Sequence, residues 1–221
     1  MEPSVPFEKE RELLIERSLR RAGITDGRVI QAFRDIPRHE FVLPQQAAAA
    51  YQDRPLPIGR GQVITQPSLV ATMTQALMLR GDEKVLEIGT GSGFQAAILA
   101  RLSRKVFTIE RIGSLARRAM ETLGRLGCDN VHVIIGDGTL GLPEEAPFDA
   151  IMVTAGAPDL PIPLVEQLRE GGRLVIPIGH DSATQILRRY VKRHGEVEGE
   201  NIEWVHFVPL IGRHGWHEDG R

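Results

Sequence analysis

The sequence contains one cysteine, Cys128, few aromatic residues (5%) and almost no excess of charge of either sign. A single cysteine excludes an internal disulfide and fits a reducing compartment, so we expect a cytoplasmic protein. Lys and Arg (27) nearly balance Asp and Glu (29), whereas a dedicated nucleic-acid binder carries a basic face, so no nucleic-acid partner is expected. The sequence also has no apolar run that could span a bilayer and no signal-peptide pattern at its start. We therefore expect no membrane partner.

Residue sets that serve hydrolases and metalloenzymes are missing as well. The sequence shows no Ser/His/Asp arrangement and no paired catalytic carboxylates. His214 and His217 lie close together, but no third ligand follows at metal-site spacing, so we expect surface histidines and no bound metal. The 221 residues have a hydrophobic content of 42%, which is enough for one substantial core. One domain with an appendage is therefore expected.

Residues 85–99 carry the most informative pattern: a short apolar strand, a turn with alternating glycines, and the start of an apolar helix. Gly89, Gly91 and Gly93 permit positive φ and remove Cβ atoms, so a ligand can approach the backbone beside the free N–H groups of the helix start. A dinucleotide site needs glycine three positions after the second glycine, where this chain has Phe94. The pattern therefore predicts a nucleotide-type cofactor and disfavours NAD and FAD.

Each of three successive strands ends in or beside an acidic residue. Glu87 lies inside the first strand, where a carboxylate suits a cationic ligand and not a pyrophosphate. Glu110 follows strand 105–109, about 20 positions after the first glycine, where a carboxylate can accept both ribose hydroxyls. Asp137 follows strand 131–135 and can accept from an adenine amino group. S-adenosylmethionine carries a sulfonium, an amino group and no phosphate, so the acidic Glu87 beside the glycine turn favours it as the cofactor.

The predicted cofactor-binding residues are Glu87, Ile88, Gly89, Thr90, Gly91, Gly93, Glu110, Arg111, Asp137 and Gly138. Other interpretations of these residues stay open. Glycine-rich turns between a strand and a helix also occur without a ligand. Glu110 can be a solvated charge beside Arg111, and Asp137 can belong to an ordinary Asp-Gly turn.

The N-terminal part of the chain predicts helices and loops. Residues 8–22 have a helical pattern, and residues 25–26 can cap a second short helix that Pro37 ends. No strand-turn-helix repeat occurs before about residue 60. We assign residues 1–80 to a helical and loop region that shapes substrate access, and residues 81–221 to the cofactor-binding domain with its C-terminal strands.

Strands and helices alternate in the rest of the chain. Besides the strands named above, the pattern predicts a helix from Gln66-Pro67 to Gly81, strands at 148–153 and 172–178, a helix at 164–168, and a terminal antiparallel pair at 184–192 and 202–210 around the polar loop 193–201. The expected fold class is α/β: a doubly wound, mostly parallel sheet of seven strands with a terminal antiparallel hairpin and an N-terminal helical extension. Ligands then bind at the carboxyl ends of the strands.

Four further segments carry a family resemblance. Residues 57–71 contain Pro-Ile-Gly and Gly-Gln-Val-Ile-Thr-Gln-Pro, and residues 37–42 read Pro-Arg-x-x-Phe-Val. With Gly-Asp-Gly at 136–138 and Phe-Val-Pro-Leu-x-Gly at 207–212, the chain resembles the protein-L-isoaspartate O-methyltransferases, a family of class I S-adenosylmethionine-dependent enzymes. The resemblance runs from about residue 10 to Gly212. It implies the Rossmann-like fold of class I methyltransferases.

The resemblance also implies which residue acts on the substrate. Thr65 stands where the family usually has serine, so a hydroxyl donor is kept, and the resemblance implies a catalytic role for it. His206 stands where the family has arginine. An alternative for Thr65 is that its side chain caps the helix that begins at Pro67.

A peptide groove is expected beside this threonine. The implied substrate-binding residues are Ile58, Ile64, Thr65, Gln66, Val208 and Leu210. Damaged sites occur in many sequences, so recognition should rest on main-chain contacts, and we expect residues 58–65 and 205–212 to line a groove for an extended peptide. The alternative is that Phe207 and Leu210 are core residues of a terminal strand.

The implied activity is methyl transfer from S-adenosylmethionine to the free carboxyl of L-isoaspartyl residues in damaged proteins and peptides, with S-adenosylhomocysteine as product. A carboxyl side chain with its ordinary pKa of about 3.9 is already anionic at neutral pH, so the step needs alignment and no general base. The ester then closes to a succinimide that reopens partly as aspartate, which is a repair. Two alternatives stay open: a methyltransferase of a small molecule or RNA, and a non-catalytic S-adenosylmethionine-binding protein. We expect a monomer.

Overall fold

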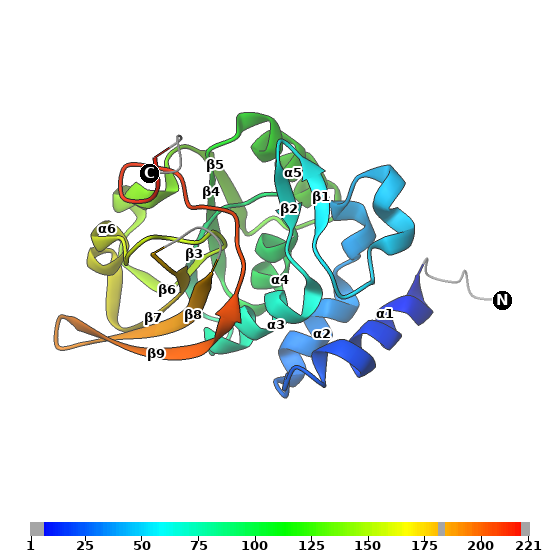
Figure 1. Ribbon diagram of the computed structural model, residues 1–221, viewed down its shortest axis with the longest axis horizontal. Coiled ribbons are helices and arrows are strands. Elements are labelled where there is room, and N and C mark those ends of the chain that lie inside the picture. Colours follow the sequence, from blue (N-terminus) through cyan, green and yellow to red (C-terminus); the bar gives the residue numbers. More distant parts are fainter. Residues whose placement is uncertain (1–6, 181–183, 218–221) are drawn as a thin grey trace.

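The computed structural model describes residues 7–180 and 184–217, which form a seven-stranded sheet with helices packed on both faces (Figure 1). The strands are β3 (Lys84–Ile88), β4 (Lys105–Glu110), β5 (Val131–Ile135), β6 (Phe148–Val153), β7 (Leu168–Ile178), β8 (Gln185–Arg193) and β9 (Glu196–Val205). Their order is β5-β4-β3-β6-β7-β8-β9; the first five run parallel, and β8 is antiparallel to both neighbours. The predicted fold class and the terminal antiparallel hairpin are confirmed.

Helices cover both faces of this sheet. They are α1 (Glu8–Leu14), which continues as a π-helix (Ile15–Leu19), α2 (Gly27–Asp35), α3 (Pro67–Ala76), α4 (Phe94–Leu102), α5 (Gly113–Arg125) and α6 (Ile162–Glu166). Short 3-10 turns lie at Arg38–Phe41, Pro44–Ala49, Gly138–Leu140 and Pro143–Glu145. Helices α1 to α5 share one core with strand residues such as Val85 and Val106, whereas α6 packs on the opposite face with Leu86 and Ile151. Among the described residues, no helix is long and apolar enough to cross a membrane.

The strand order reverses at β3, and this reversal positions the ligand site. The chain passes from β3 to β4 and β5 on one side and then returns to β6 on the other side of β3. The loops that leave β3 and β6 therefore diverge and open a crevice at the carboxyl ends of the strands. The segment after β9, drawn in red in Figure 1, runs back across these ends and forms a bridge from Pro209 to Gly156.

The N-terminal extension is mostly helical, and α2 begins and ends as predicted. Asp26 caps it, since the Asp26 carboxylate accepts a hydrogen bond of 2.9 Å from the backbone N–H of Arg28. The expectation of helices and loops alone through residue 60 is wrong, because β1 (Leu56–Gly59) and β2 (Gln62–Ile64) form an antiparallel hairpin. Strands of four and three residues are too short to show the alternation of apolar and polar residues that marks a strand in a sequence.

The terminal hairpin differs from the prediction in its turn and in its second strand. His194 and Gly195, with φ of 54° and 82°, form a two-residue turn between β8 and β9, so the strand occupies positions 196–201 that were predicted as loop. The predicted strand 202–210 is wrong beyond Val205, where β9 ends. An edge strand has one neighbour and faces solvent, so its polar sequence resembles that of a loop.

The strand β7 is longer than predicted, and the helix before it is displaced. β7 begins at Leu168, so the helix predicted at 164–168 must end earlier. The observed helix, α6, ends at Glu166. The pairing of β7 with β6 is irregular, since Phe148 pairs with Leu168 but Ala150 pairs with Arg173. The extra residues of this irregularity include two glycines, which hid the first part of the strand in the sequence pattern.

Arg38 links the N-terminal extension to the loop before α3. Its side chain is 1% exposed, and its Nε and Nη2 donate to the carbonyl oxygens of Ala50 (2.8 Å) and Thr65 (2.9 Å). The guanidinium lies 4.9 Å from the centre of the Phe94 ring, in α4. Burial lowers the pKa of Arg38 to about 9, although the negative charge of Asp53 opposes this, so the side chain stays cationic at neutral pH. The position of Thr65 therefore depends on a buried cation from the extension.

We predict that Arg38→Met lowers the free energy of unfolding by about 2–4 kcal/mol, because two buried carbonyl oxygens lose their donor. Urea denaturation monitored by circular dichroism measures this loss. Arg54→Met is the matched control, since Arg54 is exposed and its side chain bonds to Gln52 alone among the described residues, and it should change the value by less than about 0.5 kcal/mol. Equal effects of the two substitutions would contradict the linking role.

Candidate cofactor and substrate site

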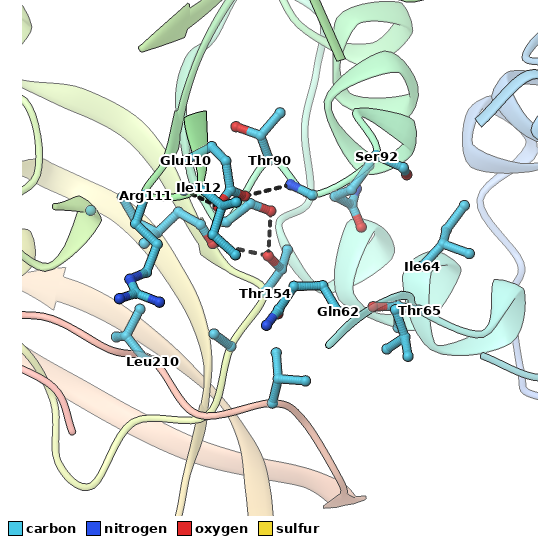
Figure 2. Close-up of a pocket in the computed structure, with 18 of the residues that line it drawn as sticks. Gln62, Ile64, Thr65, Thr90, Ser92, Glu110, Arg111, Ile112, Thr154 and Leu210 are labelled. Carbon is cyan, nitrogen blue, oxygen red and sulfur yellow. Dashed lines mark hydrogen bonds between the residues drawn. The ribbon is translucent and has the colours of Figure 1, made fainter. Parts of the chain in front are cut away.

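A cavity opens at the carboxyl ends of β3, β4 and β6 (Figure 2). Its walls come from the end of β2 with the start of α3, from the glycine turn after β3, from the residues after β4 and β6, and from the segment after β9. Of the predicted site residues, the cavity is lined by Ile64, Thr65, Ile88, Gly89, Thr90, Gly91, Glu110, Arg111, Gly138, Val208 and Leu210. Ile58, Gln66, Glu87, Gly93 and Asp137 lie outside this lining. The fold thus brings members of both predicted sets, the cofactor-binding and the substrate-binding residues, together in one cavity.

The glycine turn forms the floor of the cavity, and its backbone needs glycine for two reasons. Gly89, Gly91 and Gly93 have φ of 99°, 54° and 90°, which L side chains rarely adopt. At Gly89 a Cβ atom would lie 2.4 Å from the Thr154 hydroxyl, which itself lies 2.7 Å from the Gly89 carbonyl oxygen. Space is also short at Gly93, where a Cβ would lie 3.2 Å from Ala119. The turn is therefore packed against β6 and α5 and presents bare backbone to the cavity.

Glu110 is held rigidly at the end of β4. Its Oε2 accepts from the N–H of Gly91 and its Oε1 from the N–H of Ile112, each at 2.8 Å, as the dashed lines in Figure 2 show. The residue is only 6% exposed. Each carboxylate oxygen retains a further lone pair, so the side chain can accept two more hydrogen bonds from a ligand in the cavity.

Glu87 lies behind the cavity wall. It is fully buried, its Oε2 accepts from the Thr108 hydroxyl at 2.5 Å, and that hydroxyl is 2.6 Å from the hydroxyl of Thr90. Burial raises the pKa of Glu87 to about 8; the Thr108 hydrogen bond opposes the rise and the charge of Glu110 adds to it. Glu87 is therefore enclosed by the protein and does not line the cavity, so its contact with a cofactor stays a prediction. Glu87 Oε1 has no hydrogen-bond partner among the described residues.

Asp137 fastens the C-terminal segment. Its Oδ1 accepts from the N–H and hydroxyl of Thr139 (2.9 and 2.7 Å), and its Oδ2 accepts from the N–H of Arg213 (2.8 Å). Burial opposes the charge of Asp137, yet these donors lower its pKa below the usual value. The neighbouring Gly138 lines the cavity and Asp137 does not. Contact between Asp137 and an adenine ring stays a prediction.

Thr65 lies in the cavity wall, and its hydroxyl does not cap α3. The N-cap residue of α3 is Gln66, without a side-chain cap, and the N–H of Ser68 donates to Asp53 at 2.9 Å. The capping alternative for Thr65 is therefore wrong. Figure 2 shows Thr65 beside Ile64 on the far side of the cavity from Arg111.

The other predicted substrate residues divide into two groups. Val208 and Leu210 line the cavity, and their backbone bonds to Gly156, since Gly156 N–H donates to Val208 O and Leu210 N–H donates to Gly156 O, both at 2.8 Å. The alternative for Phe207 and Leu210 is wrong about the strand, because both lie beyond β9, but it is confirmed about the core, because each is 5% exposed and belongs to a hydrophobic core cluster. Ile58 is fully buried and packs under Gly91. Gln66 lines a neighbouring groove instead of the cavity.

Several lining residues carry no prediction from the sequence. They include Ser92, Gln95, Ile112 and Thr154, whereas Gln62 falls within the segment 58–65 that is predicted to line the peptide groove. Thr154 follows β6 directly, so the rule that finds Glu110 at the end of β4 could have found it. Gln62 belongs to the β1–β2 hairpin, which the sequence does not predict. Gln95 lies in α4, whose apolar sequence indicates a core helix and gives no sign of a ligand contact.

Comparisons with known proteins agree with this geometry. The family model described as Protein-L-isoaspartate(D-aspartate) O-methyltransferase (PCMT) matches residues 9–215. A protein-L-isoaspartate O-methyltransferase of Methanoculleus marisnigri is 53% identical over 211 residues, which cover 96% of each chain. One of Geobacter metallireducens is 52% identical over 210 residues, covering 95% of this chain and 97% of the relative.

Solved structures give the same result. A structure titled protein-L-isoaspartate O-methyltransferase has a TM-score of 0.84 at 32% identity, covering 93% of this chain and 67% of that chain. A putative protein-L-isoaspartate O-methyltransferase of Plasmodium falciparum in complex with S-adenosyl-L-homocysteine has a TM-score of 0.78 at 29% identity, covering 91% and 98%. The chain described here belongs to the protein-L-isoaspartate(D-aspartate) O-methyltransferase family.

Proposed function

We infer that this chain transfers a methyl group from S-adenosylmethionine to the free carboxyl of L-isoaspartyl residues in proteins and peptides, which starts their repair. Family membership supports the reaction. The observation that carries the inference is that one cavity joins the glycine turn and Glu110 to Thr65 and the segment around Val208. Such a cavity can hold a donor and an acceptor side by side.

The residues present fit S-adenosylmethionine, which supplies a methyl group activated by its positive sulfur. Glu110 offers lone pairs to the ribose hydroxyls, and the bare backbone of the glycine turn allows close approach. Ile112 and Gly138 form an apolar wall for an adenine ring at this end of the cavity. We assign the cofactor to this end, with its amino-acid portion toward α4.

The isoaspartyl carboxylate then belongs beside Thr65. A carboxyl with its ordinary pKa of about 3.9 is anionic at neutral pH, so no residue needs to remove a proton. The Thr65 hydroxyl donates a hydrogen bond that orients the carboxylate, and the backbone near Ile64 and Val208 holds the peptide. Alignment of this kind supplies roughly 7 kcal/mol or more through proximity. Closure of the ester to a succinimide uses the backbone nitrogen of the substrate and needs no catalytic residue.

Some expectations from the sequence remain predictions. They are the monomeric state, the cytoplasmic location, the absence of nucleic-acid and membrane partners, and the boundary between residues 1–80 and 81–221. The alternative of a small-molecule or RNA methyltransferase is disfavoured by the family match, which extends over residues 9–215 and so includes the substrate side of the cavity.

We predict that the protein methylates an isoaspartyl peptide and leaves its normal aspartyl twin unmethylated, as measured by transfer of radiolabelled methyl groups. Thr65→Val should lower kcat/KM about 100-fold, because a donor that orients the anion is lost, whereas Thr65→Ser should retain most activity. Binding of S-adenosylhomocysteine should be unchanged in both variants. Equal rates on the two peptides, or full activity of Thr65→Val, would reject the assignment.

Glu110→Gln should weaken binding of S-adenosylhomocysteine about 10- to 100-fold, since one charged acceptor of the ribose hydroxyls is lost. Isothermal titration calorimetry measures this change. The KM for the isoaspartyl peptide at saturating S-adenosylmethionine should stay within twofold of the original value. An unchanged affinity would show that Glu110 serves only to hold the Gly91 and Ile112 amides.

Glu87 should make stability fall with rising pH. Its folded pKa is about 8 against an ordinary value of 4.5, so between these values the folded chain holds a proton that the unfolded chain has released. The unfolding free energy of the unmodified protein should therefore decrease from pH 5 to pH 8, by a few kcal/mol, relative to that of Glu87→Gln, which stays neutral. Urea denaturation of both proteins across this pH range checks it. A constant difference between the two curves would contradict the buried, protonated state.

A further inference from the structure

Gln95, the second residue of α4, has a side chain whose orientation is fixed by its neighbours. It lines the cavity and is 7% exposed. Its Nε2 donates to the Thr74 hydroxyl oxygen at 3.0 Å, and that hydroxyl donates its own proton to the carbonyl of Val70 at 2.7 Å. The Thr74 oxygen can therefore only accept, so the amide of Gln95 must place its nitrogen there. Gln95 Oε1 is consequently the free end of the amide.

This oxygen has no hydrogen-bond partner among the described residues. A buried acceptor without a donor costs about 1–3 kcal/mol, and a methionine side chain would fill similar space without that cost. The apolar residues Val70, Met73 and Phe94 line the same part of the cavity. An unsatisfied acceptor in such a place indicates that a ligand supplies the donor.

A second buried polar atom without a described partner lies on the sheet face that α4 covers. Glu87 Oε1 is buried without a partner in the part of the chain that the structure describes. Glu87 belongs to the sheet face that α4 covers, because Val85, two residues before it, packs in the core with Phe94, whereas Leu86 and Ile88 pack on the opposite face. A charged donor such as an ammonium makes a stronger hydrogen bond to the Gln95 amide oxygen than a neutral donor does, and more so among apolar residues.

We propose that Gln95 Oε1 accepts a hydrogen bond from the ammonium of the cofactor's amino-acid portion, and that Thr74 is the positioning residue that orients the Gln95 amide. This proposal rests on the proposed function. With the ribose on Glu110 and the adenine toward Ile112, the amino-acid portion extends toward the start of α4. Its ammonium is then the cationic donor that reaches this part of the cavity.

Two ligands that differ in the amino-acid portion test the proposal by calorimetry. S-adenosylhomocysteine carries the ammonium, whereas 5′-methylthioadenosine has the same adenosine and sulfur without the amino-acid portion. We expect Gln95→Met to weaken S-adenosylhomocysteine about tenfold and to leave 5′-methylthioadenosine within twofold. Thr74→Val should weaken S-adenosylhomocysteine about threefold, with no effect on the other ligand. Equal weakening of both ligands by Gln95→Met, or none of either, would overturn the proposal.

A thermal control separates a binding role from a structural one. Gln167 is also 7% exposed, but both ends of its amide are satisfied, by the N–H of Leu142 (2.6 Å) and the carbonyl of Leu140 (2.8 Å). Gln167→Met should therefore lower the Tm of the ligand-free protein, and Gln95→Met should leave it unchanged or raise it. A lowered Tm for Gln95→Met would overturn the proposal. If the unmodified protein binds neither ligand, the proposed function itself fails.

Discussion

The close approach of the Thr154 hydroxyl to the backbone of Gly89 is the constraint on which the site depends. The turn after β3 adopts positive φ and lies against the Thr154 hydroxyl at the end of β6, so no side chain fits between them. Because the turn is fixed there, the N–H of Gly91 reaches Glu110 of the neighbouring strand. Three adjacent strands are thereby held together at their carboxyl ends, and the cavity opens between them. A looser turn would separate the cofactor side of the cavity from the strands that support it.

The chemistry of the site is one of position, because both reactants arrive ready to react. The acceptor is an anion and the donor carries a positive sulfur, so the protein needs to align them and exclude water. The structure is consistent with a protein whose main task is to hold the two reactants in position. Thr65, the residue assigned to the acceptor, is held through its carbonyl by the buried Arg38, and the residues assigned to the donor are held by backbone hydrogen bonds.

Sequence patterns predict those parts of this protein whose structure is determined by interactions between residues close together in the chain. The strand, glycine turn and acidic strand end around Gly89 and Glu110 follow from short-range geometry, and the parallel sheet follows from their repetition. The β1–β2 hairpin and the polar edge strand β9 are too short or too exposed to show a pattern. The complete burial of Glu87 depends on tertiary packing, which a local pattern does not record. The role of Gln95 also depends on tertiary packing, so it cannot be recognised among the apolar residues of its helix.

Among the described residues, the Asp-Gly sequences at Asp26 and Asp137 are both hydrogen-bonded, which has a consequence for the longevity of the protein itself. Asp-Gly is the kind of sequence that isomerises easily, because the glycine nitrogen can attack the aspartyl carboxyl. Here Asp26 caps α2 and Asp137 accepts from three donors. Burial opposes the charge of each carboxyl, yet these hydrogen bonds lower both pKa values, so the anionic, poorly electrophilic form is favoured. An enzyme that repairs aged aspartates thus has built-in resistance to the same ageing at these two positions.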